Sequence, residues 1–403
     1  MSEADAGPAD VVVAGGGAAG LIGALALAGA GLAVTLVAPT RRVDRRATAL
    51  MHGSVQALDA LGVWTRLAES ASPLRTMRIV DDTRRLIRAP EVAFEAHETG
   101  LDAFAWNIEN EPLLAVLEEA VAASPGIRRV TRPVVDLAPG TDDATLRLDD
   151  GSAISAALVV AADGRNSLLR ERIGIRTRSR SYPQVAVTAT LSHERPHHDI
   201  STEFHTETGP FTLVPLPGPR SNIVCVVDPR EAERLGRLDD ADFARAMERR
   251  AHSILGRMTV ETRRSAYPLG AQTAERFGAR RVALIGEAAH TIPPIGAQGL
   301  NLGIRDVATL AELVVQARRR GQDIGADAVL DAYEARRRSD VESRTLAVDL
   351  LNRSLLTGFL PAQAARGFGL WLMDRLPPLR QAIMRRGVGP TRDVPRLLLG
   401  EPL

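Results

Sequence analysis

The strongest constraint on the fold is a glycine-rich turn close to the N-terminus. Residues 11–14 (Val-Val-Val-Ala) predict a short strand buried on both faces, and the run Gly15-Gly16-Gly17-Ala18-Ala19-Gly20 follows it directly. The alanine- and leucine-rich stretch 18–30 predicts a helix, and 34–37 predicts a second strand. Glycines at these positions allow a tight turn and let backbone N–H groups approach a pyrophosphate at the positive end of the helix. The pattern therefore favours a dinucleotide-binding βαβ unit over a purely structural turn.

One expected partner of this motif is absent. A dinucleotide-binding βαβ unit usually carries an acidic residue at the end of its second strand, where the residue binds the adenosine ribose. Here the position after Val37 is Ala38, and Pro39 follows. We therefore expect ribose recognition to come from elsewhere in the chain or to be weaker.

The same stretch allows a membrane-spanning alternative. Residues 11–40 carry no charge and are long enough to cross a bilayer. A secretory signal needs a basic leading region, but residues 1–10 hold Glu3, Asp5 and Asp10 and no arginine. The glycines also interrupt the stretch where a strand, a turn and a helix would meet. The βαβ interpretation is therefore preferred.

Composition narrows the chemistry further. Lys and Arg together number 50 against 49 acidic residues, so the net charge is +1, which argues against a nucleic-acid partner. All the basic residues counted here are arginines, and the absence of lysine excludes Schiff-base chemistry on this chain. Cys225 is the only cysteine, which excludes an internal disulfide and a thiolate metal cluster. These features fit a reducing, cytoplasmic location.

The length of 403 residues predicts two or three domains. Short strands separated by Gly-, Pro- and His-rich turns at 183–228 predict an antiparallel sheet between two strand–turn–helix segments. We expect an α/β (α+β) fold in which a Rossmann-like domain is interrupted by an antiparallel-sheet domain and followed by a C-terminal helical region. The expected limits are 1–75, 105–180 and 265–330 for the first domain, 76–104 and 181–264 for the second, and 331–403 for the helical region.

Two later turns also have the composition of ligand-binding loops. Asp163-Gly164-Arg165-Asn166-Ser167 follows an apolar strand, although an Asp-Gly pair in this position is more often a plain turn. Arg165 and Arg170 could face phosphates or simply solvent. No GxSxG, no HExxH and no His/Cys cluster is present, so we expect no metal site and no hydrolytic triad. His193, His197, His198 and His205 are interpreted as residues of the sheet and its turns.

The longest motif follows the apolar run 282–285. It reads Gly286-Glu287-Ala288-Ala289-His290 and continues to Gln298-Gly299-Leu300-Asn301 at the start of a helix. Free backbone amides beside the positive end of a helix stabilise an anion, such as the N1–C2 edge of a reduced flavin. Glu287 could accept hydrogen bonds from ribityl hydroxyls, or it could be an ordinary carboxylate at the start of a helix. His290 is interpreted as structural rather than as a catalytic base.

Taken in order along the chain, these motifs resemble the class A flavoprotein monooxygenases of the para-hydroxybenzoate hydroxylase fold. The closer resemblance is to the FAD-dependent hydroxylase family of ubiquinone biosynthesis, and it covers residues 10–390. Besides the glycine-rich turn and Asp163-Gly164, it rests on residues 46–50, 54–58 and 61–64 and on the string Pro294 to Asp306. Ala38, Glu287 and Glu111 depart from the family pattern, which usually has Glu, Asp and an Arg or Gln at these positions.

The resemblance implies one FAD as cofactor and no catalytic side chain, because the flavin carries the chemistry. The implied cofactor-binding residues lie in the four motifs: Gly15, Gly17, Ala18, Ala19, Gly20, Arg46, Asp163, Gly164, Glu287, Gly299, Leu300 and Asn301. The implied reaction is ring hydroxylation through a flavin C4a-hydroperoxide, with O2 and NAD(P)H or another electron donor. The implied substrate is a lipid-tailed aromatic compound, a polyprenylated phenol of ubiquinone biosynthesis. A non-catalytic FAD-binding or accessory protein and a flavin-dependent isoprenoid reductase remain the alternatives.

The antiparallel sheet would then cover the flavin and form the substrate wall. Candidate wall residues are Phe204, His205, Val214 and Pro215 on the sheet, together with Pro294. The tail region 350–384 combines apolar runs with arginines, which suits reversible contact with an inner-membrane surface or with a biosynthetic complex. The alternative is that its apolar face packs on the FAD-binding domain.

Overall fold

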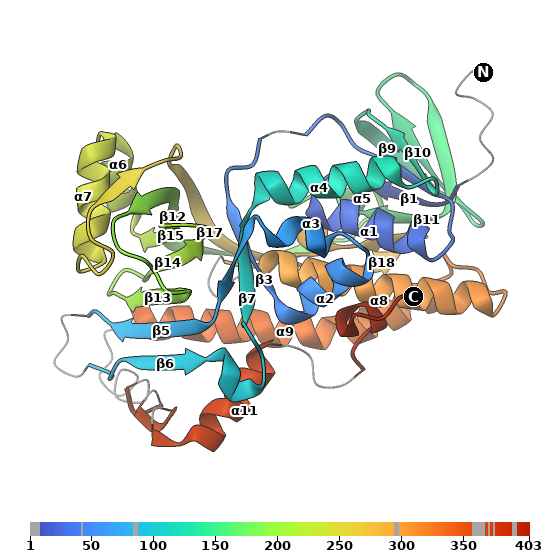
Figure 1. Cartoon of the computed structure of the whole chain (residues 1–403). Helices are drawn as coiled ribbons and strands as arrows, with labels where there is room; N and C mark the ends of the chain where they lie inside the picture. The colour runs from blue at the N-terminus through green and yellow to red at the C-terminus, as the bar shows by residue number, and fades with distance from the viewer. Residues whose placement is uncertain are drawn as a thin grey trace.

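A computed structural model describes residues 9–41, 43–83, 88–293, 298–356, 367–369, 371–373, 375–388 and 393–403. Its first large sheet has eight strands, and five of them run parallel in the order β19-β11-β1-β2-β8 (Figure 1). Val11, Val12 and Val13 at its centre are fully buried, which confirms the predicted strand. The bounds are β1 Ala9–Ala14, β2 Val34–Val37, β8 Ile127–Val130, β9 Val134–Pro139, β10 Ala144–Leu148, β11 Ala153–Ala161, β18 Gly278–Ala279 and β19 Val282–Leu284.

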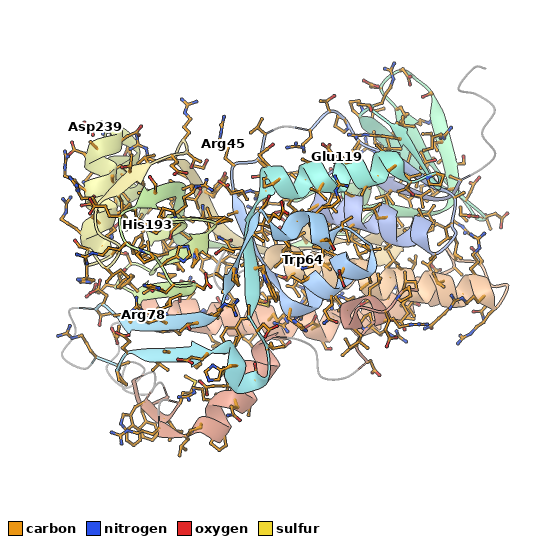
Figure 2. The ribbon with its side chains drawn as sticks, viewed as in Figure 1. Arg45, Trp64, Arg78, Glu119, His193 and Asp239 are labelled. Atoms are coloured by element: carbon orange, nitrogen blue, oxygen red, sulfur yellow. The ribbon has the colours of Figure 1, made fainter. Side chains whose placement is uncertain are left out.

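Helices pack around this sheet and complete the dinucleotide-type domain (Figure 1). The first helix, α1, connects β1 to β2 and packs against α4 and α8. Trp64 of α3, labelled in Figure 2, packs edge-on against Trp106 with 5.7 Å between ring centroids. The bounds are α1 Ala18–Gly29, α2 His52–Ala60, α3 Trp64–Ala68, α4 Asn110–Ala123, α5 Leu168–Arg172, α8 Gly299–Arg319 and α9 Asp327–Leu356.

The second large sheet has nine strands and is almost entirely antiparallel, as predicted; only β13 and β5 pair in parallel. Its outer face packs against α6 and α7, which the sequence did not predict (Figure 1). His193, labelled in Figure 2, lies inside this sheet, where it is hydrogen-bonded to Ser221 and to the carbonyl of Arg195. The bounds are β5 Thr76–Asp81, β6 Val92–Glu95, β12 Thr177–His193, β13 Ile200–His205, β14 Pro210–Leu216, β15 Arg220–Val227, α6 Pro229–Arg237, α7 Asp240–Arg250, β16 Met258–Val260, β17 Ser265–Ala274 and β20 His290–Thr291.

A small sheet of three strands lies between the two larger ones and was not predicted either. It consists of β3 Ala47–Met51, β4 Ala71–Leu74 and β7 Ala105–Glu109. The remaining elements are the 3-10 helices η1 Ala96–Thr99, η2 Gly286–Ala288 and η3 Arg396–Leu399 and the helix α11 Pro377–Val388. Among the residues described, no helix is both long enough and apolar enough to cross a membrane.

The α/β fold class is confirmed, but two of the expected domain limits do not coincide with the sheets. The strands β12 and β17 stay paired from Thr177↔Ala274 to Thr188↔Ser265. Both therefore belong to the antiparallel sheet along their whole length, although the expected limits cut at 180 and 265. The segment 76–104 contributes β5 and β6 to the same sheet.

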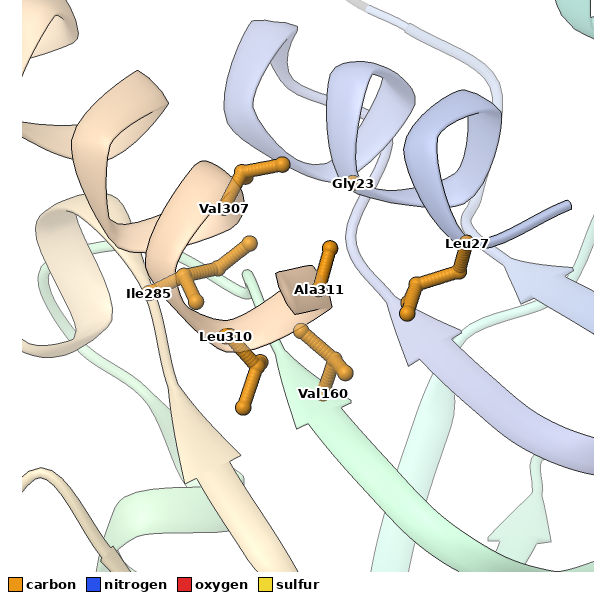
Figure 3. Close-up of a pocket in the computed structure, with 7 residues that line it drawn as sticks. All are labelled: Gly23, Leu27, Val160, Ile285, Val307, Leu310 and Ala311. Carbon is orange, nitrogen blue, oxygen red and sulfur yellow. The ribbon is translucent and has the colours of Figure 1, made fainter. Parts of the chain in front are cut away.

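The seam between α1 and α8 is closed by small apolar residues. Figure 3 shows the pocket lined by Gly23, Leu27, Val160, Ile285, Val307, Leu310 and Ala311, and this pocket has no room for a water molecule. It is therefore part of the core and not a ligand site. A Cβ on Gly23 would lie 3.5 Å from Ile285 and 3.6 Å from Val307, which is ordinary van der Waals contact.

We expect Gly23→Ala to raise the free energy of unfolding by about 1 kcal/mol, because alanine favours the helix interior and the added methyl is buried. Gly20→Ala is the matched change three residues earlier. Its Cβ would lie 2.0 Å from the carbonyl oxygen of Gly15, so we expect a loss of about 1–3 kcal/mol. Denaturant unfolding of the two variants measures both effects, and a destabilised Gly23→Ala protein would contradict this description of the seam.

Candidate cofactor site

Two glycines of the N-terminal motif are required by the chain's own packing. Gly15 has φ +126°, and a Cβ there would lie 2.1 Å from the carbonyl oxygen of Ala162 at the end of β11. A Cβ on Gly20 would meet the carbonyl oxygen of Gly15. These two residues allow the strand, the turn and α1 to pack closely, and the α1 N-terminus lies beside Asp163 as a result.

Gly17 differs from Gly15 and Gly20 because the space that a Cβ would occupy on Gly17 is open and faces away from the protein. It is exposed at the N-cap of α1, with φ −76° and ψ 171°, which any residue can adopt. Of the residues described, none places an atom within 4 Å of a Cβ on Gly17. The amides of Ala18 and Ala19 begin the helix here without a side-chain cap. The turn therefore leaves an uncapped helix N-terminus and free space in front of it.

Ala38 lies where the ribose-binding acid was expected. It is 2% exposed, and its Cβ lies 2.9 Å from the Cβ position of Gly16. Three residues further on, Arg41 donates to both carboxylate oxygens of Glu111 at 2.8 and 2.9 Å. Glu111, which departs from the family pattern, is therefore held by an ion pair at the start of α4.

One carboxylate oxygen of Asp163 accepts a hydrogen bond, and the other has no hydrogen-bond partner among the residues described. Its Oδ2 accepts a hydrogen bond from the Leu169 amide at 3.1 Å, whereas Oδ1 is buried and has no hydrogen-bond partner among the residues described. Burial raises the pKa of Asp163, and hydrogen bonds from Ser167 and Leu169 oppose this effect. A buried oxygen without a partner is costly, so it marks a place where a bound ligand would supply a donor. Gly164, with φ +86°, turns the chain directly after it.

The two arginines near Asp163 have different environments. Arg170 is buried, and it donates to the carbonyl oxygens of Ala288 at 2.8 Å and Arg165 at 3.0 Å. It therefore ties the Asp163 turn to η2 and does not face a phosphate. Arg165 is exposed and donates to Gln272 of β17 at 3.4 Å.

Arg46 lies at the junction of the two domains. Its guanidinium binds Asp44 through Nε at 2.8 Å and Nη2 at 2.7 Å. These hydrogen bonds raise the pKa of Arg46 above its ordinary value, with smaller electrostatic contributions from Glu287 and from Tyr267 of β17. The predicted residues Arg46 and Glu287 therefore interact electrostatically. Glu287 lies on η2 and is exposed.

The start of α8 is a second uncapped helix N-terminus. Gly299 is exposed, and no atom of the described residues lies within 4 Å of a Cβ there. The N-cap residue Gln298 makes no side-chain capping bond to the helix, so the amides of Gly299 and Leu300 can bind a ligand.

The side chain of Asn301 is hydrogen-bonded within the protein. Its buried side chain accepts hydrogen bonds from the Met51 amide at 2.8 Å and the Ser54 hydroxyl at 2.7 Å, and it donates to the Ala49 carbonyl at 2.8 Å. The side chain joins α8 to β3 and α2, because a buried amide must satisfy its own donors and acceptors. Only its backbone can face a cofactor.

A buried carboxylate fixes η2 relative to α8. Asp306 accepts hydrogen bonds from the Gly286 amide at 2.9 Å, from His290 Nε2 at 2.7 Å and from Arg337 Nε at 2.8 Å. The structural interpretation of His290 agrees with this buried pair. A Cβ on Gly286 would lie 3.2 Å from Ala19, so η2, α1 and α8 meet at small residues.

The predicted substrate residues do not share one face of the sheet. Phe204 packs with Phe211 toward α6 and α7, on the outer face, and we remove it from the substrate wall. His205 follows on the opposite face, where it is buried and bonded to Glu203 at 2.8 Å. Val214 packs with the cluster of Ala49, Leu74 and Ala105, on the inner face.

The other two candidates are not on that wall. Pro215 alternates with Val214 and therefore points the other way, and its carbonyl accepts a hydrogen bond from Asn107 at 2.8 Å. Pro294 lies outside the described residues.

Sequence reasoning missed several residues that build the site. Asp44 orients Arg46, Ser54 anchors Asn301, and Asp306 holds η2 in place. Only Asp306, next to Arg305 in the quoted string, offered a signal, because a charge pair inside an apolar helix pattern indicates buried partners.

Two uncapped helix N-termini, an open glycine and an unpartnered buried carboxylate oxygen together fit a large anionic dinucleotide. FAD has this chemical form; if it bound here, the α1 N-terminus would hold its pyrophosphate, Asp163 and Glu287 would accept from its hydroxyl groups, and the α8 N-terminus would hold an anionic ring edge. The fold and the site therefore define a flavin-dependent class of protein. The sequence matches the family described as FAD binding domain (FAD_binding_3) over residues 8–346, and the chain belongs to this family.

Curated relatives match along nearly the whole chain. The ubiquinone hydroxylase UbiL of Rhodospirillum rubrum is 34% identical over 412 residues, covering 98% of this chain and 94% of the relative. The 3-demethoxyubiquinol 3-hydroxylase of Escherichia coli is 30% identical over 392 residues, covering 95% and 99%. The chain is thus an FAD-dependent oxidoreductase of the hydroxylase type.

Solved structures agree on the fold. The p-nitrophenol 4-monooxygenase PnpA of Pseudomonas putida DLL-E4 superposes with a TM-score of 0.79 at 21% identity, covering 96% of this chain and 99% of that one. HpxO of Klebsiella pneumoniae, solved with FAD and uric acid, gives a TM-score of 0.74 at 21% identity, covering 97% of both chains.

Proposed function

We propose that this protein hydroxylates the aromatic ring of a polyprenylated phenol in ubiquinone biosynthesis, using FAD, O2 and NAD(P)H or another electron donor. The observation that carries the proposal is that two uncapped helix N-termini accompany a sheet with an apolar patch on its inner face. The relatives named as ubiquinone hydroxylases support this choice of substrate class. In this proposal FAD is held by the motif residues Gly15, Gly17, Ala18, Ala19, Gly20, Arg46, Asp163, Gly164, Glu287, Gly299, Leu300 and the backbone of Asn301.

The inner face of the antiparallel sheet supplies an apolar wall. Ala186, Val226 and Leu269 form a buried cluster there, with Val224 and Tyr182 packed against it. Tyr267 pairs with Ala186 in the strand register and therefore lies on the same face, and it interacts electrostatically with Arg46, as Glu287 also does. Such a wall suits a neutral aromatic ring with an isoprenoid tail and excludes water from it.

Bound FAD supplies the oxygen-activating chemistry once it has been reduced. The chain's own residues hold the ring against the apolar wall, and the α8 amides stabilise negative charge at the flavin edge. No side chain needs to act as an acid or base in this account. The protein contributes position, electrostatics and the exclusion of water.

We expect the FAD-loaded protein, supplied with NADH or NADPH and a short-chain prenylated phenol under isotope-labelled dioxygen, to release a phenol carrying one labelled oxygen atom. Mass spectrometry of the product measures this, and the same phenol without its prenyl chain serves as the control. Saturation of the isoprenoid chain without labelled oxygen would instead support a reductase. No turnover of any phenol by protein that holds FAD would support the accessory alternative.

We further propose that the C-terminal region contacts an anionic bilayer surface. Phe368, Trp371, Leu376 and Ile383 are exposed there, and Arg375 lies 5.9 Å from the Trp371 ring centroid. Aromatic and aliphatic side chains beside arginine suit the headgroup boundary of an anionic membrane. Part of the tail region 350–384, including 357–366, lies outside the described residues.

The opposite side of this region is packed against the protein, but on β6 and η1 of the segment 76–104 and not on the FAD-binding domain. Met384 joins Val92, Phe94 and Phe104 in a buried cluster, and Arg380 binds Glu98 at 2.7 Å. These contacts fix α11 on η1 and leave the aromatic residues outside. Membrane contact and packing on the protein therefore concern two different faces of the same region.

We expect full-length protein to float with anionic vesicles at low salt and the double variant Phe368→Glu/Trp371→Glu to lose most of that binding. Two added charges oppose both the insertion of the ring faces and the attraction to anionic lipid. Val43→Glu, which changes an exposed apolar residue elsewhere, is the control and should float like the unchanged protein. Equal flotation of all three proteins would assign the exposed rings no role at membranes.

A further inference from the structure

A buried amide of α9 carries a hydrogen-bond acceptor without a partner at the inner face of the antiparallel sheet. Asn352 is fully buried, and its Nδ2 donates to Gln184 Oε1 of β12 at 2.9 Å. Its Oδ1 is buried as well, but it accepts no hydrogen bond from any residue that the structure describes. In a protein interior such an acceptor is costly unless a bound group donates to it.

The orientation of this amide is fixed by a chain of hydrogen bonds. Gln184 Nε2 donates to the Thr208 carbonyl at 2.7 Å, so the oxygen of the Gln184 side chain is the atom that faces α9. Only Nδ2 of Asn352 can donate to that oxygen, because an amide nitrogen is a donor and an amide oxygen is an acceptor. Exchanging the two atoms of Asn352 would bring two oxygens together. The unpartnered atom is therefore the acceptor.

The amide lies beside the apolar cluster that the proposed function assigns to the substrate. A Cβ on Gly209 would lie 2.9 Å from Gln184 Nε2 and 2.6 Å from Val226, which is a member of that cluster. Three residues earlier on α9, Asp349 accepts a hydrogen bond at 3.0 Å from Tyr182, which packs against the same cluster. α9 therefore passes over the inner face here and adds a neutral acceptor beside the apolar cluster.

The same helix connects this acceptor to the candidate cofactor site. Arg344 Nη1 donates at 3.1 Å to the side-chain oxygen of Gln298, the N-cap residue of α8. Asn352 lies further along α9 by two turns of helix, which is about 12 Å. This separation leaves room for a cofactor edge and one aromatic ring between the α8 N-terminus and Asn352.

We propose that Asn352 Oδ1 accepts a hydrogen bond from the ring hydroxyl of the phenol, and that it selects compounds in which this hydroxyl is free. The amide oxygen is an acceptor only, so it binds the protonated phenol and cannot bind a methyl ether or a quinone carbonyl at the same position. A site that would be left with an unpaired buried acceptor rejects an analogue without the donor. The inference rests on the proposed function, because it requires an aromatic substrate on this face of the sheet.

The test compares the affinities of the FAD-loaded protein for a short-chain prenylated phenol and for the same compound without its hydroxyl group. Equilibrium dialysis without an electron donor measures binding and not turnover. We expect the unchanged protein to bind the phenol about tenfold more tightly than the deoxy compound. Asn352→Leu, which replaces the acceptor by an apolar side chain of similar shape, should bind both compounds about equally. A ratio of two affinities remains measurable when a substitution weakens both.

Two further variants assign the effect to this atom. Asn352→Asp keeps an oxygen acceptor at the same position and should still prefer the phenol. Thr190→Val is the matched control, because Thr190 is also fully buried and its Oγ1 also has no hydrogen-bond partner in the described part of the chain. Thr190 lies four residues after Ala186 in β12 and therefore on the same inner face. This variant should keep the preference of the unchanged protein.

A preference for the phenol that survives in Asn352→Leu would overturn the assignment of Asn352, and so would its loss in Thr190→Val. Neither result would affect the proposed hydroxylation of phenols, since the unchanged protein would still bind its substrate. If the unchanged protein binds neither compound, the proposed function is wrong, and this inference is wrong with it.

Discussion

Gly17→Val is expected to abolish stoichiometric FAD binding while the protein stays folded. The valine side chain would occupy the space in front of the α1 N-terminus, where the pyrophosphate has to approach the amides. Because no described atom lies within 4 Å of the new Cβ and the backbone is extended, the main cost is the loss of glycine at the helix N-cap, about 1 kcal/mol of folding free energy. We expect the FAD content after purification to fall at least about tenfold.

The matched control for this variant is Gly29→Val at the other end of α1. A Cβ on Gly29 also has no described atom within 4 Å, so the change adds the same side chain to the same helix. It should keep full FAD content. A folded Gly17→Val protein with stoichiometric FAD would place the pyrophosphate somewhere other than α1.

Asp306→Asn is expected to cause the largest loss of stability, about 3–5 kcal/mol. The carboxylate is fully buried and binds Arg337, His290 and the Gly286 amide. An amide cannot accept from all of these donors, so the Arg337 charge would be left partly uncompensated in the core. We also expect FAD content to fall, because the position of η2 depends on the Gly286 bond. Denaturant unfolding of FAD-free protein separates the two effects.

Asp331→Asn is the control, because Asp331 pairs with Arg276 on the surface and should contribute below about 1 kcal/mol.

The buried contacts of Asp306 also predict that the folding stability depends on pH. Burial opposes ionisation of Asp306, but His290 and Arg337 outweigh it and lower its pKa. A depressed carboxyl pKa contributes stability that is present above the unfolded pKa of about 4 and is lost as the pH falls below it. Asp306→Asn should therefore flatten the acid limb of the stability profile, and an unchanged limb would contradict this role.

The sequence predicted the parts of the fold that depend on local pattern. The β1–α1–β2 unit was found because apolar runs and glycines are contiguous there, and the same is true of the start of α8. The three-stranded sheet was missed because β3, β4 and β7 pair across many residues. Their short sequences carry no turn signal that would join them.

In the candidate site too, the sequence predicted the positions of local motifs but not the contacts between residues distant in sequence. Gly15, Gly17 and Gly20 lie where the motif placed them, but only the structure shows that Gly17 alone opens outward. The family resemblance placed Asn301 at the cofactor, and only the structure shows that its side chain binds β3 and α2, which are about 250 residues away in sequence. Phe204 was predicted on the wrong face because strand alternation fixes relative and not absolute orientation.

We propose that the helix N-termini of α1 and α8 hold FAD in an enzyme that reacts with oxygen. The most direct measurement is the visible absorption spectrum of the purified protein through one cycle of reduction and exposure to air. We expect the two bands of oxidised flavin, bleached by a reductant and restored by oxygen. A colourless protein that cannot be reconstituted with added FAD would contradict the claim.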